Sequence, residues 1–328
     1  MGDDALGQMI AGFLGRMDPA LAEHLVVSPG DASSYSLVLN PPGVDRCFMH
    51  CTGANDTFVA SECPLDMATS GRVFHFGYPP LMRQIYSDEG VGLTALMEQI
   101  QNAGVLTSLD LAFPDPESDA GKVDWHQWLR CVLPNVDVFL PSFDEVLLML
   151  DPTRYRDLVK KADGGNPASH ASIQLVSDLA GQLAEMGPAI VGLKLGDEGL
   201  FLKTKNAAHC FANRSKWTTM PSDGWADQEL LAPCFEVTVG GTTGSGDCTA
   251  AGFLGALLKH HNAYESATRA VAVGAFNVES SDATSGIQPW SSVEQRLQAD
   301  WSRRDESITL TGWEFNEQHG VFSPKDPT

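Results

Sequence analysis

Residues 241–247 read "GTTGSGD" and lie within a longer run, "FEVTVGGTTGSGDCTAAGFLGALL" (235–258). The run passes from a β-rich stretch through a glycine-rich turn into an apolar helix of small residues. Glycines allow the backbone amides of such a turn to point at one place, and the start of a helix carries a partial positive charge. The stretch therefore predicts a strand–loop–helix unit whose loop can bind an anion.

Asp247 decides which kind of anion site this is. The spacing resembles a P-loop, but a P-loop has lysine where this chain has Asp247, and the glycines do not fit GxGxxG. Phosphoryl transfer to a hydroxyl reconciles the two features, because the amides hold the phosphoryl charge while a carboxylate takes the acceptor's proton. A tight strand-to-helix turn without a ligand is the alternative.

Composition limits the class of protein and its partners. The chain has 328 residues, 21 Lys and Arg against 42 Asp and Glu, and a formal net charge of −21. So negative a surface disfavours nucleic acid and anionic membranes as partners. The seven cysteines, the acidic N-terminus and the absence of a long apolar run predict a soluble, cytoplasmic protein.

The order of expected elements predicts an α/β fold. After a helix at about 4–16, residues 33–54 read as a β-hairpin, and short apolar runs then alternate with helices, which predicts a mostly parallel sheet covered on both faces. We expect "CFEVTV" (234–239) to be a strand, 205–231 to be an irregular surface excursion, and 315–328 to be a frayed tail. All of this fits one domain, 1–328.

Four loops fall at the carboxyl ends of the expected strands, where open α/β sheets bind ligands. They are "DLAF", "PSFDE", "LGDEG" and "GGTTGSGD".

The glycine loop resembles the C-terminal signature of the PfkB, or ribokinase-like, family of carbohydrate kinases. "GDDALGQMIAGFL", "LVLNPPGVDRCFMHCTGAND", "VDVFLPSFDEVL" and "VGLKLGDEGLFL" resemble other motifs of that family, in the family's order. The resemblance implies a Rossmann-type sandwich with a small β lid, 33–54, that closes over the sugar, and it covers most of the chain.

The resemblance also implies roles for single residues. Asp247 matches the catalytic base, and Gly244, Ser245 and Gly246 match the anion hole. The ATP-binding positions are Lys194, Gly196, Gly199, Thr243 and Asn277, and the substrate-binding positions are Gly53 and Asn55. Glu145, with Ser142, matches the site that organises magnesium through water.

Several of these positions have a plain structural alternative. Glu145 can be a first-turn helix acid, Asn55 can be a cap, and Lys194 can be a solvated charge at a strand end.

The chain departs from the family's pattern in three places. Ser142 stands for an asparagine, and Gly241 stands for an aspartate often tied to a monovalent-cation site. The family's first strand, with its substrate aspartate, and the following GG motif have no counterpart. We therefore expect either a truncated chain or a member that has lost part of its sugar pocket.

These observations predict ATP-dependent phosphorylation of a hydroxyl of a sugar or sugar-like compound, with magnesium; a need for a monovalent cation stays open. A nucleoside kinase of the same family is one alternative. A catalytically weak nucleotide-binding protein is another. A homodimer formed through the lid is a further expectation from the resemblance.

Overall fold

The protein is built around one large mixed β-sheet. The computed structural model describes residues 1–39, 47–217 and 224–325. In these residues the sheet has eight strands in the order β3-β4-β5-β6-β7-β8-β10-β9. Their bounds are β3 (Val73–Phe76), β4 (Leu106–Leu109), β5 (Val138–Phe139), β6 (Ile190–Lys194), β7 (Leu200–Thr204), β8 (Glu229–Ala232), β9 (Trp313–Asn316) and β10 (Val321–Pro324).

The sheet changes direction halfway across. Neighbouring strands are parallel from β3 to β6, and every pairing from β6 to β9 is antiparallel. The strand at 200–204 pairs back on β6 as the sequence predicts, with Lys194 opposite Leu200. The expected α/β fold with a parallel central part is confirmed.

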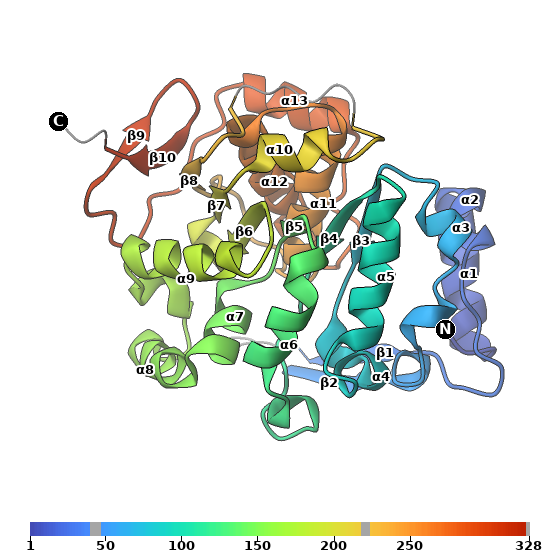
Figure 1. The fold of residues 1–328 in the computed structure, drawn as a ribbon. Coiled ribbons are helices and arrows are strands. Elements are labelled where there is room, and N and C mark those ends of the chain that lie inside the picture. The colour runs from blue at the N-terminus through green and yellow to red at the C-terminus, as the bar shows by residue number, and fades with distance from the viewer. Residues whose placement is uncertain (40–46, 218–223, 326–328) are drawn as a thin grey trace.

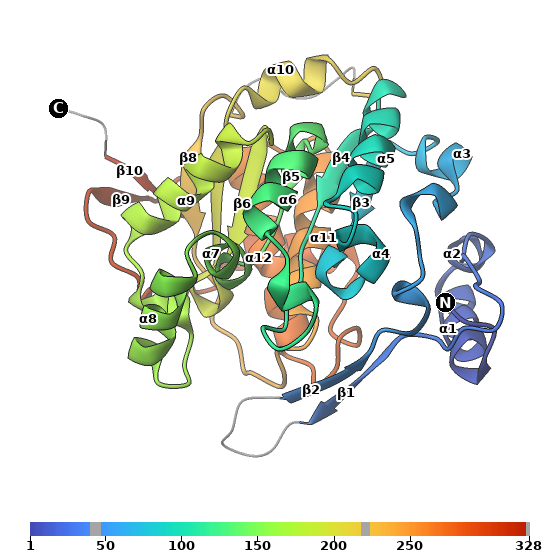
Figure 2. The same ribbon diagram turned by 60° about the horizontal axis from the view of Figure 1, so that its bottom comes forward.

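Helices cover the sheet on both faces, so that three layers are stacked (Figure 1, Figure 2). One layer contains α5 (Val91–Asn102), α6 (Trp125–Val132), α7 (Phe143–Leu150) and α9 (Ile173–Glu185), with α8 (Pro152–Ala162) beyond α7. The other contains α11 (Ser245–Leu258), α12 (Ala263–Val278) and α13 (Trp290–Gln298). Two separate apolar clusters fill the two interfaces, and they include the fully buried Phe139 and Phe253 respectively. Each side of the sheet therefore has its own core.

The N-terminal part lies beside this sandwich. It contains α1 (Ala5–Met17), α2 (Pro19–Glu23), and a separate two-stranded sheet of β1 (Tyr35–Leu39) and β2 (Cys47–Cys51), with α3 (Leu65–Ala68) and α4 (Arg83–Tyr86) following. β1 and β2 pair antiparallel, from Tyr35 opposite Cys51 to Leu39 opposite Cys47. They form the expected hairpin, which projects below the main sheet in Figure 2. The expected "PPG" turn between them lies outside the described residues.

Two expectations for the C-terminal half are wrong. The strand before the glycine loop is β8 at Glu229–Ala232 and not 234–239, where Phe235 makes only an isolated bridge to Arg303. Residues 315–325 do not fray, because β9 and β10 pair with each other and β10 pairs with β8. Val321 is fully buried in this pairing, and burial of apolar area of this kind holds the tail on the sheet.

The segment 205–217 is also more ordered than the sequence predicts. It contains α10 (Ala207–Ala212) and packs across the end of the sheet where β4 and β5 begin (Figure 1). The Arg214 guanidinium reaches into the protein and contacts both carboxylate oxygens of Asp137, at 3.0 and 2.5 Å. Apolar side chains of this region, Phe211, Trp217 and Trp225, are buried. Because the segment is mostly polar, the sequence did not indicate these buried contacts.

Candidate active site

The glycine loop passes from the end of β8 to the start of α11. Gly240 and Gly241 donate their amides to the carbonyl of Val278, at 2.8 and 3.2 Å, so this half of the loop is tied to the end of α12. Gly244 then takes φ = +78° and caps α11. A Cβ on Gly244 would lie 2.9 Å from the Cβ of Ala283, so both its backbone conformation and the space around it require glycine.

The amides at the start of α11 differ in their partners. Those of Gly244, Gly246 and Asp247 have no hydrogen-bond partner within the described parts of the chain. The amide of Ser245 donates to Thr242 O at 3.3 Å, and its hydroxyl donates to the same oxygen at 2.9 Å. The loop therefore offers three free donors at a helix N-terminus, an arrangement suited to a phosphate.

Asp247 lies in the first turn of α11, and its carboxylate accepts a hydrogen bond from the hydroxyl of Tyr78. Tyr78 follows β3, so the bond joins two parts of the chain 169 residues apart. Burial and the Asp247 charge raise the pKa of Tyr78 above its ordinary value. The phenol is consequently a stable donor at neutral pH.

Lys194 lies beside the glycine loop, at the end of β6. Its Nζ is 2.5 Å from Asp110 Oδ2, and both side chains are buried. A Cβ on Gly246 would lie 3.7 Å from this nitrogen. Burial lowers the pKa of the ammonium, but the carboxylates of Asp110 and Glu145 outweigh burial and raise it. The solvated strand-end alternative for Lys194 is therefore wrong.

Glu145 lies in the first turn of α7, and the amide of Ser142 donates to its Oε2 at 2.7 Å. Glu145 is thus a first-turn helix acid, the alternative that the sequence left open, and it also caps the helix. Burial raises the pKa of Glu145 to about 7, against the opposing effect of the Lys194 charge. Asp110, Lys194, Glu145, Asp247 and Tyr78 thus form one group of interacting charges and dipoles, which we call the polar cluster.

Asn277 and Thr243 connect the glycine loop to α12. The Asn277 side chain is fully buried, and its Nδ2 donates to the carbonyl of Thr243 at 2.8 Å. Its Oδ1 is buried and accepts no hydrogen bond from the described residues. The contact fixes the loop at the residue before Gly244.

The expected nucleotide-loop glycines lie between β6 and β7. Gly199 has φ = +107°, and a Cβ there would lie 2.1 Å from the carbonyl oxygen of Ala232. Gly196 has φ = +64° and is packed against Asn166. The tight turn brings this loop against the chain that leads into the glycine loop, because β7 pairs with β8.

Gly53 and Asn55 form the short helical turn that follows β2. Gly53 approaches the backbone of the segment before β1 so closely that a Cβ would lie 2.5 Å from Ala32 O. The Asn55 side chain makes no hydrogen bond to the part of the chain that the structure describes, so the capping alternative is not observed.

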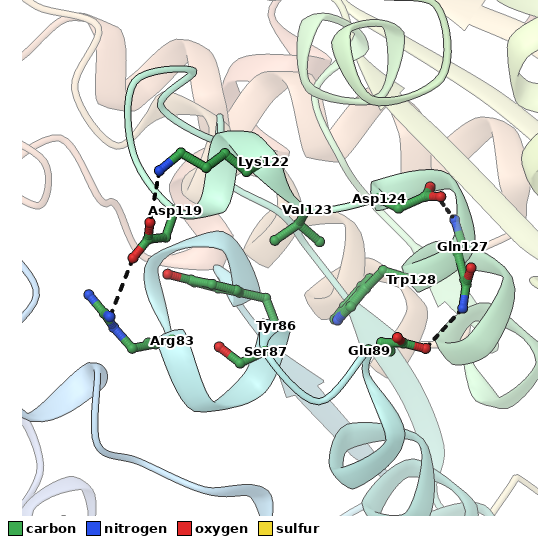
Figure 3. A pocket seen from close by; sticks show the side chains of 10 residues that line it. All are labelled: Arg83, Tyr86, Ser87, Glu89, Asp119, Lys122, Val123, Asp124, Gln127 and Trp128. Atoms are coloured by element: carbon green, nitrogen blue, oxygen red, sulfur yellow. Dashed lines mark hydrogen bonds and ion pairs between the residues drawn. The ribbon is translucent and has the colours of Figure 1, made fainter.

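A cavity of about 420 Å³ lies elsewhere, and Figure 3 shows it from close by. Arg83 joins Asp56 and Asp119 at its rim, each at 3.4 Å, and Tyr86 and Trp128 line it. None of the polar-cluster residues lines this cavity. Its cations are already paired with carboxylates, so it does not suit an anionic ligand.

Sequence reasoning missed two members of the polar cluster. Asp110 was placed on a converging loop without a role, and Tyr78 was not singled out. His75, on β3, is a third nearby group: the surrounding protein and the Lys194 charge lower its pKa to about 4. Tyr78 belongs to no motif of the sequence, and its place just after β3 is the only feature that could indicate a role.

The side chains of the polar cluster suit a magnesium ion only if they hold it indirectly, through water. Within 1–39, 47–217 and 224–325, no three His, Cys, Asp or Glu side chains are grouped so as to hold a metal ion. Magnesium commonly keeps several waters and is held by one or two carboxylates together with substrate phosphates. Glu145 fits such an indirect role, since it is a buried carboxylate that is not paired with Lys194 in an ion pair, as Asp110 is.

The same ranges contain no helix long and apolar enough to span a bilayer.

The fold and the site define the chain as a ribokinase-like α/β protein. Residues 44–290 match the pfkB family carbohydrate kinases, which is most of the chain. The chain belongs to this family, as the resemblance implied.

Solved structures agree with this fold. An E. coli protein described as a ribokinase II, in complex with ATP and Mg2+, has a TM-score of 0.65 at 18% identity, covering 91% of this chain and 81% of that one. The ribokinase of Arabidopsis thaliana complexed with ribose and ATP has a TM-score of 0.63 at 17% identity, covering 91% and 80%. The fructokinase of Xylella fastidiosa with bound ATP has 0.63 at 17%, covering 91% and 83%. No curated protein sequence matches the chain.

Proposed function

We propose that this protein transfers the γ-phosphoryl group of ATP to a hydroxyl of a sugar or sugar-like compound. One observation carries the proposal: the free amides of Gly244 and Gly246 open the same helix turn that presents Asp247. Donors for a phosphoryl group and an acceptor for a proton are thus fixed side by side. Family membership and the ATP-bound relatives support the same reaction.

Each group has a separate task in this proposal. The Asp247 carboxylate takes the proton from the acceptor hydroxyl, whose oxygen attacks the γ-phosphorus. The amides of the anion hole stabilise the charge on the transferred group, and the Lys194 ammonium adds a positive charge next to it. Both effects lower the barrier to phosphoryl transfer: Asp247 removes the proton from the acceptor, and the amides with Lys194 stabilise the charge on the transferred group.

ATP is placed by the loops on either side of the cluster. Gly196 and Gly199 allow the backbone to approach the nucleotide, and Asn277 holds the loop through Thr243. Mg2+, when bound, neutralises charge on the phosphates. Glu145 and Ser142 would hold it through water, and Glu145 must be ionised to do so.

The acceptor side of the proposal rests on the hairpin of β1 and β2. Gly53 and Asn55 lie directly after it and are our candidates for sugar contacts. The exposed apolar side chains of the hairpin, Leu37, Val38 and Leu39, support its role as a lid that closes or pairs with a second copy. The homodimer and the cytoplasmic location both belong to this proposal.

Acceptor-dependent turnover tests the function. We expect ADP formation from ATP and Mg2+ to require a sugar and to yield a sugar phosphate. Nucleosides run beside the sugars would reveal a nucleoside kinase. ATP binding without turnover by any acceptor would contradict the proposal and leave a nucleotide-binding protein.

A further inference from the structure

The hydrogen bond between Tyr78 and Asp247 is a contact that the reaction, as described so far, does not use. The phenol donates to Oδ1 of the carboxylate that serves as base. Within the described ranges, Oδ2 has no hydrogen-bond partner, and the Asp247 side chain is exposed. One oxygen of the base is therefore occupied by the protein, and the other is open to an incoming hydroxyl.

The backbone at Tyr78 is built to hold this side chain in place. Tyr78 has φ = +62°, which is uncommon for any residue other than glycine and more so for a bulky one. The two prolines that follow, Pro79 and Pro80, are buried and have restricted backbones. Strained positions of this kind persist only where the surrounding structure imposes them, and they cluster at functional sites.

The titratable groups around Asp247 also favour the hydrogen bond from Tyr78 to Asp247. The titratable groups that face Asp247 are His75 on β3, Tyr78 in the turn after β3, Asp110 directly after β4 and Lys194 on β6, together with Cys248 on the same helix as Asp247. Only Lys194 is a cation at neutral pH, and Asp110 already accepts from it at 2.5 Å. The Tyr78 hydroxyl is consequently the group that directly satisfies the Asp247 carboxylate.

We propose that Tyr78 is a positioning residue that orients the Asp247 carboxylate so that its free oxygen faces the acceptor hydroxyl. This inference rests on the proposed kinase function. A carboxylate on the first turn of an exposed helix end rotates freely, and a bond to a fixed phenol removes that freedom. Orientation of a reacting group is a recognised source of rate enhancement.

Four proteins test the proposal: the parent, Tyr78→Phe, Asp247→Asn and the double variant. Tyr78→Phe keeps the ring and removes only the hydroxyl. We expect it to lower kcat roughly 10-fold and to leave the KM values for ATP and acceptor within about 2-fold. In the Asp247→Asn background the same change should have no further effect, because Tyr78 acts only through the base. Tyr86→Phe, which removes a hydroxyl at the separate cavity, is the matched control.

Three kinetic results would overturn the proposal. A lower acceptor KM with an unchanged or higher kcat would mean that the phenol occupies the acceptor's place. Equal losses in both backgrounds would mean that Tyr78 acts independently of Asp247. A kcat that falls only in proportion to a lower melting temperature would mean a purely structural residue.

Denaturant unfolding with Asp247→Ala in place of Asp247→Asn separates this inference from the function itself, because alanine cannot accept the hydrogen bond of the phenol. If the hydrogen bond is real, the stability losses of Tyr78→Phe and Asp247→Ala are not additive, and the double variant Tyr78→Phe/Asp247→Ala loses little more than Asp247→Ala alone. Additive losses overturn the inference even in an active kinase. Coupled stabilities in a protein that turns over no acceptor would leave the contact standing and reject the kinase function.

Discussion

Lys194 and Asp110 form a buried ion pair beside the glycine loop, with Nζ 2.5 Å from Oδ2. The two residues come from the carboxyl ends of β6 and β4, which β5 separates in the parallel part of the sheet, and they lie 84 positions apart. The pair places a positive charge beside Gly246 of the glycine loop and keeps that charge in position with the buried carboxylate of Asp110. A change to either residue of this ion pair should therefore affect both the charge beside the loop and the stability of the fold.

We expect Lys194→Met to lower both stability and turnover. Breaking a buried ion pair from one side leaves an uncompensated charge, which costs about 3–5 kcal/mol. The double variant Lys194→Met/Asp110→Asn, which removes both charges, should recover most of the melting temperature and none of the turnover. Recovery of turnover in the double variant would show that Lys194 only neutralises Asp110.

Asp247→Asn should reduce turnover while the fold stays intact. The amide keeps the size and the hydrogen bonding of the side chain but cannot take a proton, and general-base catalysis contributes about 10²–10⁴-fold. ATP affinity should be unchanged or higher, because a negative charge near the anion hole is removed. Single-turnover rates and ATP binding measure the two effects, with Asp66→Asn as an exposed control. Near-normal turnover would remove the base from the mechanism.

Gly244→Val should impair phosphate binding and turnover together. Valine at φ = +78° is strained, and its Cβ would meet Ala283 at 2.9 Å. Gly164→Val is the matched control, since Gly164 has φ = +90° with nothing within 4 Å of a Cβ. Both variants incur backbone strain, so a loss of ATP binding confined to Gly244→Val isolates the effect on the loop. Equal ATP affinity in the two variants would argue against an anion hole here.

The stability contributed by Glu145 and Asp144 should fall as pH rises from about 4 to about 7, while His75, whose pKa is lowered to about 4, contributes in the opposite direction. Burial raises the pKa of Glu145 to about 7 and that of Asp144 to about 6, so these two carboxyls bind more protons in the folded chain than in the unfolded chain across this window. Stability from these carboxyls is full below their unfolded values and is lost as pH rises through the folded ones. Denaturant unfolding against pH measures the slope, which Glu145→Gln should raise and the exposed-residue control Glu98→Gln should not. An unchanged slope in Glu145→Gln would refute the assignment.

Potassium should activate the enzyme weakly or not at all. Gly241 supplies no side-chain ligand, and its amide is bonded to Val278 O. Initial rates with potassium and with a bulky organic cation give the comparison, and Gly241→Asp should introduce or strengthen activation. Strong activation of the parent that this substitution fails to enhance would mean that backbone oxygens alone hold the ion.

The sequence singles out those residues of the candidate site that have local signals. Gly244, Gly246 and Asp247 lie within three residues of one another, and their spacing predicts an anion loop with a base, which stays a prediction. Tyr78 could not be found in this way, because its role depends on a partner 169 residues away. Asp110 has the same limitation, since a lone aspartate after a strand has many uses.

The errors in the fold have a common physical cause. "CFEVTV" alternates like a strand, but β7 pairs with Glu229–Ala232, and Pro233 then ends the pairing by lacking an amide hydrogen. The segment before it is mostly polar, so the sequence does not show that Trp217 and Trp225 are buried. Side chains that cover them come from other parts of the chain as well. Local composition predicts local structure and does not report distant packing.

Arg214 limits which segments of this chain can be deleted. Its guanidinium satisfies Asp137, whose carboxylate also accepts from Gln101 and from the amide of Thr107, at the end of the sheet opposite the glycine loop. A deletion that joined β7 directly to β8 would leave that carboxylate buried without its cation. The stretch that the sequence predicts to be an irregular surface excursion is therefore a poor place for a deletion or a fused tag, and a minimal version of this enzyme has to keep it.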